Sequence, residues 1–265
     1  MLRTTLNLLR CLRWWQRGRH TAAQWRDTAA TAPPPVAAAP NQLETFFDAR
    51  RDGRGIWKWR HYFDIYHRHF APLRHRPGLV VVEIGVYSGG SLDMWRNYFG
   101  PSAQIYGIDI ESACRAYEQP GTHILIGDQA DPLFWRRVLG DGTLPAPDIV
   151  IDDGGHTPTQ QRVTMEEVLP RIRPGGVYIC EDVHGNLNAF GGMIGGWALA
   201  MNDVSHMQTD SADPDKRLVV PTNEVQATFD SLHVYPYVVV IEKRNRRLPE
   251  LRAPKHGTQW EPFLS

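Results

Sequence analysis

Acidic side chains follow two apolar segments of the sequence, and a histidine stands close behind the first group. The segment DIVIDDGGH places Asp152, Asp153 and His156 after one apolar run, and ICEDVH places Glu181 and Asp182 after the next. Apolar runs of this kind are typical of buried parallel strands, whose neighbouring ends lie about 5 Å apart. Four carboxylates at one edge of a sheet would raise one another's pKa or bind a cation.

The residue types indicate the chemistry of such a cluster. Carboxylate oxygens suit Mg²⁺, Ca²⁺ or Mn²⁺ rather than zinc. His156 follows Asp153 by three residues, so its imidazole would lie beside the acids and could act as a general base. For His184, a local structural role and a contact with substrate both stay open. The alternative for the acids is structural, with some of them capping helices or pairing with Arg162, Arg171 or Arg173.

A glycine-rich turn follows an earlier apolar run, in the segment VVVEIGVYSGGS at residues 80–91. Gly85 and Gly89 would let the backbone pass close to a ligand, and Ser91 would begin a helix with free N–H groups. The spacing differs from the GxGxxG of dinucleotide-binding folds. Glu83 would repel a pyrophosphate but attract a cation, which favours S-adenosylmethionine with its sulfonium and ammonium groups. A purely structural turn is the alternative.

Two further strand ends would complete a site for an adenosine ligand. Asp109 ends the next apolar run in IYGIDIE, where an acid can accept hydrogen bonds from both ribose hydroxyls. The alternative is that Asp109 caps the helix that follows. A third run ends at Gly127 and Asp128, and the loop at this point could border the adenine.

The elements that must position these residues alternate along the chain. Apolar runs predict strands at residues 79–84, 104–108, 123–126, 148–151 and 177–180. Helical patterns lie between them at residues 91–99, 132–139 and 159–171. The alternation predicts an α/β fold with a doubly wound, mostly parallel sheet, in which ligands bind at the carboxyl ends of the strands. Residues 238–241 have no helix after them and predict an antiparallel C-terminal strand that closes the sheet.

An aromatic segment precedes the first predicted strand. Residues 56–70 read IWKWRHYFDIYHRHF, and a helix there would carry Trp57, Trp59, Tyr62, Phe63, Tyr66 and Phe70. Aromatic residues at this spacing indicate a core-facing helix. A wall that faces the substrate is the alternative.

The first forty residues differ from the rest of the chain. They contain six arginines and one acid, and residues 1–20 place leucines and tryptophan near helical spacing. This pattern predicts a basic amphipathic helix that contacts a membrane surface or an acidic partner, or else packs on its own protein or an oligomer mate. Residues 28–40 predict a stiff Pro/Ala linker, so we expect one globular domain at residues 41–265.

The overall composition excludes several classes of protein. The 265 residues carry 29 Lys+Arg and 29 Asp+Glu, which argues against a nucleic-acid partner because polyanion binding favours a basic domain. Three cysteines without metal spacing fit a reducing compartment. No apolar run is long enough to span a membrane, so we expect a cytoplasmic protein, with its first helix a candidate for the inner membrane face.

Together the motifs resemble the class I S-adenosylmethionine-dependent sugar O-methyltransferases of the macrocin and mycinamicin type. The resemblance runs from about residue 58 to 243 and rests on EIGVYSGGS, YGIDI, GDQADPLFW, IDDGGH, RPGGVYICEDVH and YPYVVVIEK. It implies a Rossmann-like methyltransferase fold, with Asp153, Glu181 and Asp182 as ligands of Mg²⁺ or Mn²⁺ and His156 as the base. It also implies that the methyl donor contacts residues of the strand ends, for which we take Glu83, Gly85, Tyr87, Gly89, Ser91, Asp109, Gly127, Asp128 and Asp152.

The implied function is methylation of a sugar hydroxyl on a glycosylated small molecule or glycan. Residues 185–215 should shape the acceptor site but match no part of the family pattern, so the acceptor itself stays open. Two other functions would use the same residues. One is a metal-dependent methyltransferase for a catechol-like or lipid-linked phenol, and the other is a non-catalytic subunit that binds adenosylmethionine. Assembly into a homo-oligomer is a further expectation from the family.

Overall fold

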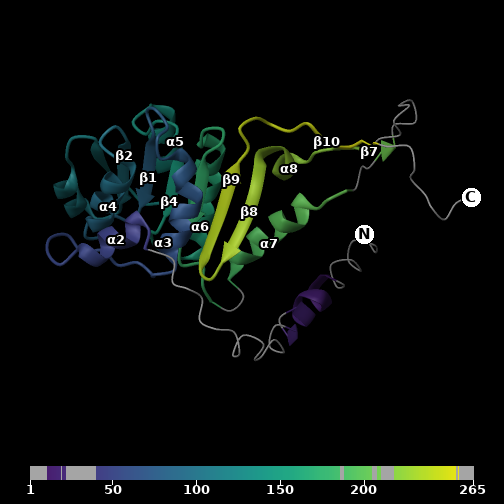
Figure 1. The fold of residues 1–265 in the computed structure, drawn as a ribbon, viewed down its shortest axis with the longest axis horizontal. Helices are drawn as coiled ribbons and strands as arrows, with labels where there is room; N and C mark the ends of the chain where they lie inside the picture. Colours follow the sequence, from purple (N-terminus) through teal and green to yellow (C-terminus); the bar gives the residue numbers. More distant parts are fainter. Residues whose placement is uncertain are drawn as a thin grey trace, which may run out of the picture. The chain divides into compact units, whose positions relative to one another are not determined.

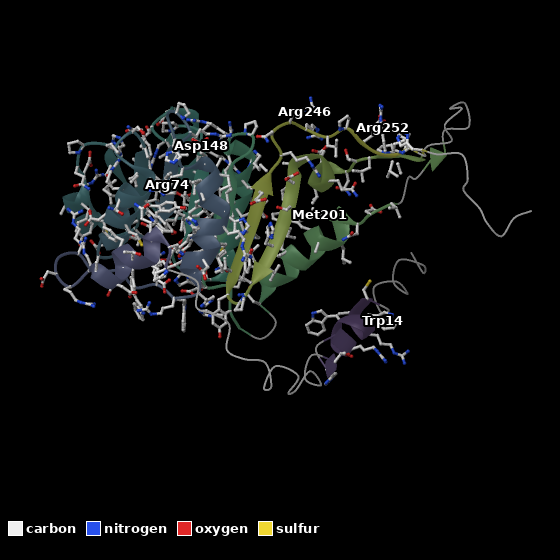
Figure 2. All side chains as sticks on the ribbon, viewed as in Figure 1. Trp14, Arg74, Asp148, Met201, Arg246 and Arg252 are labelled. Atoms are coloured by element: carbon white, nitrogen blue, oxygen red, sulfur yellow. The ribbon has the colours of Figure 1, made fainter. Side chains whose placement is uncertain are left out.

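The computed structural model describes residues 11–18, 20, 21, 40–185, 188–204, 208, 209, 218–254 and 256. The chain divides into two units, Met1–Ala39 and Pro40–Ser265. Within the first unit the described residues form a helix, from which Trp14 projects with its side chain exposed (Figure 2). Nearly all of the predicted Pro/Ala linker lies outside the described residues. Among the helices that the structure describes, none combines the length and the apolar character needed to cross a bilayer.

The second unit is built on a twisted sheet (Figure 1). In the described residues it has seven strands in the order β3-β2-β1-β4-β5-β9-β8. The strands are β1 (Val80–Ile84), β2 (Gln104–Asp109), β3 (Thr122–Ile126), β4 (Ile149–Asp152), β5 (Val177–Cys180), β8 (Phe229–Tyr235) and β9 (Val238–Lys243). β1 to β5 are parallel, and β9 runs antiparallel to β5. The predicted mostly parallel sheet with an antiparallel C-terminal strand is confirmed.

Helices cover both faces of this sheet because side chains alternate between the faces along each strand. The first face packs against α2 (Gln42–Ala49), α3 (Tyr62–Phe70) and α4 (Gly90–Phe99), with Val81 of β1 in the same apolar cluster. The second face packs against α5 (Pro132–Gly140), α6 (Pro158–Val168) and α7 (Ala189–Met201), with Val80 and Val82 in that cluster. The result is a three-layer, doubly wound fold.

The end of the sheet differs from the prediction. Residues 238–241 form part of β9, as expected, but β9 lies between β5 and β8, so β8 is the strand that closes the sheet. β8 and β9 form a hairpin, in which Tyr235 pairs with Val238. The prediction for the closing strand was wrong because the half-exposed β8 lacks the continuous apolar run that marks β9.

The aromatic segment at residues 56–70 also differs from the prediction. The helix α3 begins only at Tyr62, and its aromatic residues are buried as expected. Trp57 and Trp59 precede the helix with 87% and 54% of their surface exposed, so their assignment to the core was wrong. Lys58 between them is buried instead. Exposed and more buried residues alternate along this non-helical segment, and the charged Lys58 is the one that points inward.

A second, smaller sheet was not anticipated. The described strands β6 (Gln208–Thr209), β7 (Leu218–Pro221) and β10 (Glu250–Ala253) are antiparallel in the order β10-β7-β6. The short helix α8 (Glu224–Thr228) leads from β7 into β8. Residues 185–215, which we expected to shape the acceptor site, contribute α7 to the second face of the main sheet.

Candidate active site

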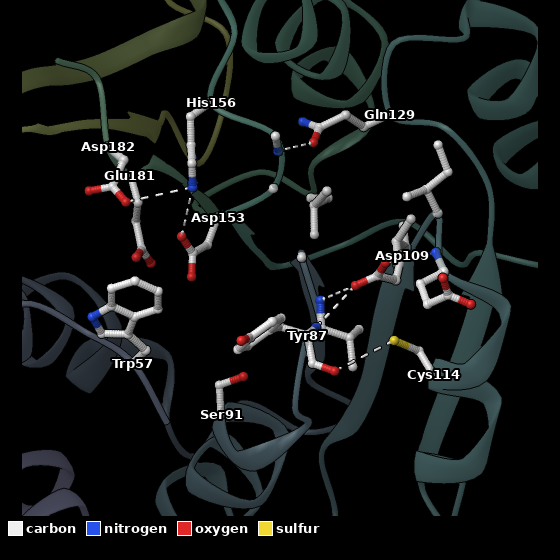
Figure 3. Close-up of a pocket in the computed structure, with 18 of the residues that line it drawn as sticks. Trp57, Tyr87, Ser91, Asp109, Cys114, Gln129, Asp153, His156, Glu181 and Asp182 are labelled. Carbon is white, nitrogen blue, oxygen red and sulfur yellow. Dashed lines mark hydrogen bonds and ion pairs between the residues drawn. The ribbon is translucent and has the colours of Figure 1, made fainter. Parts of the chain in front are cut away.

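The carboxyl ends of the parallel strands open into one cavity of about 890 Å³ (Figure 3). Strand register explains this, because Ile84 pairs with Asp152, and Asp152 pairs with Cys180, so the residues that follow each strand are neighbours. Most of the residues predicted from the sequence line this single cavity: Gly85, Tyr87, Ser91, Asp109, Gly127, Asp128, Asp153, His156, Glu181 and Asp182. The glycine turn and the acidic strand ends are therefore parts of one site.

Three predicted cofactor residues lie behind the cavity wall. Asp152 is buried and accepts hydrogen bonds from the Tyr178 hydroxyl (2.7 Å) and from Nε2 of Gln129 (3.0 Å). Burial raises the pKa of Asp152 to about 7. Glu83 is buried and accepts a 2.6 Å hydrogen bond from Ser91, while Gly89 precedes α4 with a left-handed φ of 73°. None of the three residues lines the cavity, and Asp152 and Glu83 contact residues that do.

A lysine that sequence reasoning missed lies at the centre of the acidic cluster. The Nζ atom of Lys58 lies 2.5 Å from Oδ2 of Asp153, 3.0 Å from Glu181 and 3.6 Å from Glu83. Only 3% of its side chain is exposed. Burial by itself would lower the pKa of Lys58, but the three carboxylates outweigh it and the pKa is raised. The signal in the sequence was the excess of acids at the strand ends, which requires a nearby cation.

Glu181 is bound by Lys58 and by a tyrosine of α3. Its carboxylate accepts hydrogen bonds from Lys58 and from the Tyr66 hydroxyl, the latter at 2.6 Å. Burial raises the pKa of Glu181, and the charge of Asp153 raises it further. Tyr66 lies on α3, so this helix determines where the Glu181 carboxylate points.

Asp153 also belongs to a second group, with His156 and Asp182, that faces the cavity (Figure 3). Nε2 of His156 lies 3.8 Å from Oδ1 of Asp153 and 3.6 Å from Oδ2 of Asp182. One potential ligand atom from each of the three residues lies within 4.8 Å of the others. The second oxygen of Asp182 accepts hydrogen bonds from Trp59 (3.1 Å) and Tyr62 (2.7 Å). These two contacts fix the carboxylate with its remaining oxygen toward His156.

The backbone is unusual at these residues. Four described non-glycine residues have positive φ, and three of them line the cavity: Tyr87 (48°), His156 (56°) and Asp182 (52°). Such conformations cost free energy and persist where the surrounding structure imposes them. After His156, the helix α6 begins with a capping box between Thr157 and Gln160. This cap fixes the backbone that follows the histidine.

The glycine turn is held by Asp109. Oδ2 of Asp109 accepts hydrogen bonds from the backbone N–H groups of Val86 (2.8 Å) and Tyr87 (3.0 Å), and Oδ1 accepts one from Glu111. Gly85 has a φ of 88°, and a Cβ there would lie 2.0 Å from the carbonyl oxygen of Asp153. The turn between β1 and α4 therefore packs directly on the loop that carries the catalytic candidates.

Gln129 was also missed by sequence reasoning. Its Nε2 donates to Asp152, and its Oε1 accepts a 2.7 Å hydrogen bond from the backbone N–H of Gly155. Gln129 follows the end of β3, so it ties the loop after that strand to the loop that carries His156. A glutamine after a strand gives no distinctive pattern in the sequence.

Aromatic side chains surround the mouth of the cavity. Trp57, Trp59 and Tyr87 all line it, and Tyr87 has 74% of its surface exposed. The Tyr237 ring lies 5.8 Å from that of Trp59. We call Trp57, Trp59, Tyr87 and Tyr237 the aromatic rim. The alternative interpretation of the two tryptophans, as a wall that faces the substrate, agrees with this placement.

Comparison with known proteins identifies relatives of this architecture. The chain is 34% identical over 249 residues to the 8-demethyl-8-alpha-L-rhamnosyl tetracenomycin-C 2'-O-methyltransferase of Streptomyces olivaceus, across 83% of this chain and 64% of the relative. It is 33% identical over 195 residues to the mycinamicin VI 2''-O-methyltransferase of Micromonospora griseorubida, across 67% of this chain and 47% of that enzyme. No protein-family model matches the chain.

The solved structures agree with these sequence relatives. The MycE methyltransferase of the mycinamycin biosynthetic pathway, in complex with Mg and SAH, superposes with a TM-score of 0.58 at 28% identity. The match covers 71% of this chain and 50% of that one. The chain is a homologue of the macrocin and mycinamicin sugar O-methyltransferases. It spans only about half to two thirds of the length of the two curated relatives described above. The macrocin/mycinamicin resemblance predicted from the motifs is thereby confirmed.

Proposed function

We propose that this chain transfers a methyl group from S-adenosylmethionine to a sugar hydroxyl of a glycosylated natural product, with Mg²⁺ or Mn²⁺ bound at the acidic strand ends. The observation that carries the proposal is the single cavity that contains both the glycine turn and the group formed by Asp153, His156 and Asp182. The relatives named as O-methyltransferases of glycosylated compounds support the same activity.

The side chains present suit a hard divalent cation. Oδ1 of Asp153 and Oδ2 of Asp182 both face His156, and all three residues line the cavity, from which oxygen ligands outside the protein can approach. Mg²⁺ prefers carboxylate ligands and keeps several positions for water or substrate oxygens. Lys58 supplies one positive charge to Asp153, Glu181 and Glu83, so these three acids together with Asp182 keep an excess of negative charge for a metal ion. A bound divalent ion would lower the pKa of a coordinated sugar hydroxyl.

Different groups of the protein would accept the proton and position the methyl donor during methyl transfer. Nε2 of His156 would accept the proton of the sugar hydroxyl as its oxygen attacks the methyl carbon. The new O–CH₃ bond forms as the S–CH₃ bond breaks, and the sulfonium becomes a neutral thioether. The turn held by Asp109 would position the donor. Holding the two reactants in line can supply about 7–11 kcal/mol of the barrier reduction.

A methyl-transfer assay on a panel of acceptors tests the proposal. The full chain is incubated with labelled S-adenosylmethionine, Mg²⁺ and rhamnosides or other deoxyglycosides, and methylated sugar is identified by mass spectrometry. We expect transfer to a sugar hydroxyl, loss of transfer in excess chelator and recovery with Mg²⁺ or Mn²⁺. Transfer at an unchanged rate in chelator would remove the metal from the mechanism.

The aromatic rim supports a second candidate, a metal-dependent methyltransferase for a catechol-like or lipid-linked phenol. Exposed rings at the mouth of a cavity can stack on a flat acceptor as well as on a sugar face. The same panel therefore includes catechols and simple phenols. Faster transfer to these compounds than to every glycoside would favour the second candidate.

A further inference from the structure

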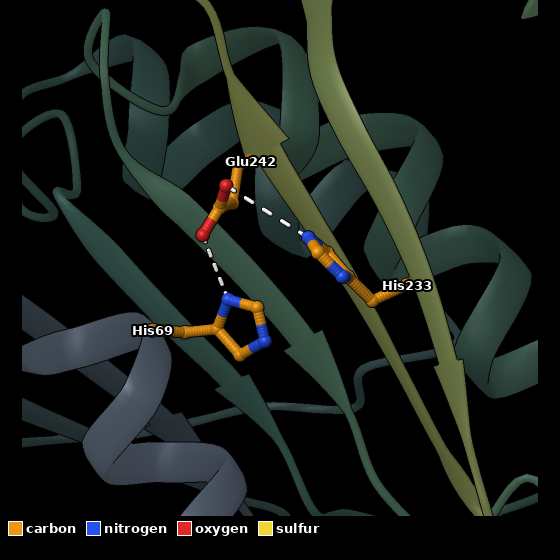
Figure 4. A group of neighbouring side chains, drawn as sticks. All are labelled: His69, His233 and Glu242. Atoms are coloured by element: carbon orange, nitrogen blue, oxygen red, sulfur yellow. Dashed lines mark hydrogen bonds and ion pairs between the residues drawn. The ribbon is translucent and has the colours of Figure 1, made fainter.

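A second cluster of potential ligands lies away from the cavity. His69, His233 and Glu242 meet where α3 packs on the hairpin of β8 and β9 (Figure 4). One donor atom from each residue lies within 4.8 Å of the other two. None of the three lines the cavity described above.

Strand register brings these residues together. Ser231 of β8 pairs with Glu242 of β9, and His233 follows two residues later, so it projects from the same face as Ser231. His69 comes from α3, which covers that face. Glu242 pairs with Val177 at the start of β5, whereas Glu181 follows the end of β5. The cluster therefore lies about 13 Å from the acidic strand ends, at 3.3 Å for each strand residue.

His69 is held on both ring nitrogens. Its Nδ1 lies 2.7 Å from Oε1 of Glu242, and its Nε2 lies 3.0 Å from the Tyr235 hydroxyl. Arg68 donates to the same hydroxyl at 3.2 Å. Only 2% of the His69 side chain is exposed. A histidine that ligates a metal typically uses one nitrogen while an oxygen atom orients the other, and Tyr235 supplies such an oxygen.

His233 completes the donor set from the edge strand. Its Nε2 lies 3.9 Å from Oε2 of Glu242 and 2.9 Å from the Ser231 hydroxyl. The same hydroxyl donates to Oε2 of Glu242 at 2.8 Å. Ligand atoms about 2.0–2.2 Å from a tetrahedral ion lie about 3.3 Å from one another. The separations of 2.7 Å from Oε1 and 3.9 Å from Oε2 of Glu242 bracket that value.

We propose that His69, His233 and Glu242 form a binding site for a borderline divalent transition metal ion such as Zn²⁺, with the Ser231 hydroxyl or a water molecule as the fourth ligand. Two imidazoles and one carboxylate are typical zinc donors, in contrast to the oxygen-rich group at the cavity.

A metal ion bound at this site would link the edge strand of the sheet to α3. β8 is the last strand of the sheet, and His233 is on it. Tyr62, at the other end of α3, holds Asp182, and Tyr66, in the middle of the helix, holds Glu181. A metal at the second cluster would therefore stabilise the helix that positions the catalytic candidates, without contacting substrate.

Metal titration of the chelator-treated full chain tests the proposal. Zn²⁺ binding is followed by calorimetry, and Co²⁺ binding is followed by the visible absorption of a tetrahedral site. Because Zn²⁺ can also occupy the cavity, the titrations use the Asp153→Asn background. We expect one Zn²⁺ bound in this background, a raised melting temperature, and affinity weakened by at least about tenfold on adding His233→Ala. His75→Ala, at an exposed histidine, is the matched control.

The outcomes separate this site from the cavity. His233 is half-exposed, so its truncation should leave the fold intact, and circular dichroism of the metal-free variant checks this. Equal Zn²⁺ affinity with and without His233→Ala would overturn the proposal. Absence of Zn²⁺ binding in the Asp153→Asn background would overturn it as well. Neither result bears on methyl transfer, which the acceptor assay measures independently.

Discussion

The ammonium group of Lys58 lies 2.5 Å from the Asp153 carboxylate, so the aspartate that faces His156 is bound to a cation of the protein itself. Glu181 and Glu83 surround the same ammonium group. Three acids at neighbouring strand ends are thus partly neutralised from within. This arrangement leaves the cavity-facing oxygens of Asp153 and Asp182 for an external ligand.

Replacing Lys58 by methionine should destabilise the fold. The change keeps the length of the side chain but leaves three buried or half-buried carboxylates without their shared cation. Loss of one partner of a buried ion pair costs about 3–5 kcal/mol. The free energy of unfolding is measured by urea denaturation. Arg60→Met, which removes exposed pairs with Asp48 and Glu44, should cost less than about 1 kcal/mol. Equal stability of the two variants would contradict the assigned role of Lys58.

Replacing His156 by alanine should slow methyl transfer while leaving donor binding intact. A general base typically contributes about 10²–10⁴-fold to the rate. The turnover number is measured in the acceptor assay, and the affinity for S-adenosylhomocysteine is measured by calorimetry. His75→Ala serves as the control, since that residue is exposed. Wild-type turnover by His156→Ala would exclude the histidine as the base.

Substitutions of Asp182 and of Glu181 should differ in their effect on metal binding. Asp182→Asn changes a carboxylate that faces His156, so we expect about 10–100-fold weaker activation by Mg²⁺. Glu181→Gln changes a carboxylate bound to Lys58 and Tyr66, so we expect its main effect on the free energy of unfolding. For both variants, activation by Mg²⁺ is measured by titrating the activity, and the free energy of unfolding is measured by urea denaturation.

Asp230→Asn provides the matched control for these acids, because its side chain is 57% exposed and pairs with Arg244. It should alter neither measurement. A loss of Mg²⁺ activation in Glu181→Gln as large as that in Asp182→Asn would restore Glu181 as an equal metal ligand, as the sequence resemblance implies.

Replacing Trp57 by alanine should weaken acceptor binding selectively. Trp57 lines the cavity mouth and is largely exposed, so its removal should leave stability unchanged. Loss of aromatic stacking is worth about 0.5–1.5 kcal/mol, equivalent to a rise in acceptor KM of up to about tenfold. The KM for S-adenosylmethionine should stay constant. Trp14→Ala, at another exposed tryptophan, is the control, and an unchanged acceptor KM in Trp57→Ala would exclude the aromatic rim from acceptor binding.

Cys114 should resist alkylation near neutral pH. Burial, helped by the charge of Asp109, raises the pKa of this thiol to about 11. The thiolate is the reactive form, and only about 0.1% of the thiol is ionised at pH 8. The rate of alkylation should therefore rise about tenfold per pH unit toward pH 11. Iodoacetamide labelling followed by mass spectrometry should modify the exposed Cys11 first. Rapid labelling of Cys114 at pH 8 would contradict this environment.

The order of elements was readable from the chain because local patterns determine it. Apolar runs separated by helical segments predicted β1 to β5 and the helices between them, with bounds close to those in the structure. The acids after β4 and β5 could be placed at one edge because parallel strands present their carboxyl ends together. This is why Asp153, His156 and Asp182 were correctly expected to lie close to one another.

Pairings across long stretches of sequence were decided only by the tertiary structure. Lys58 lies 95 residues from Asp153 and 123 from Glu181, and no local pattern marks it as their partner. The two tryptophans beside it fit a helical stripe by spacing, yet the segment forms no helix and both side chains are exposed. Likewise, His69 and Glu242 meet only because α3 packs on β9. Periodicity reports which face of an element is apolar, whereas charge pairing depends on which elements become neighbours.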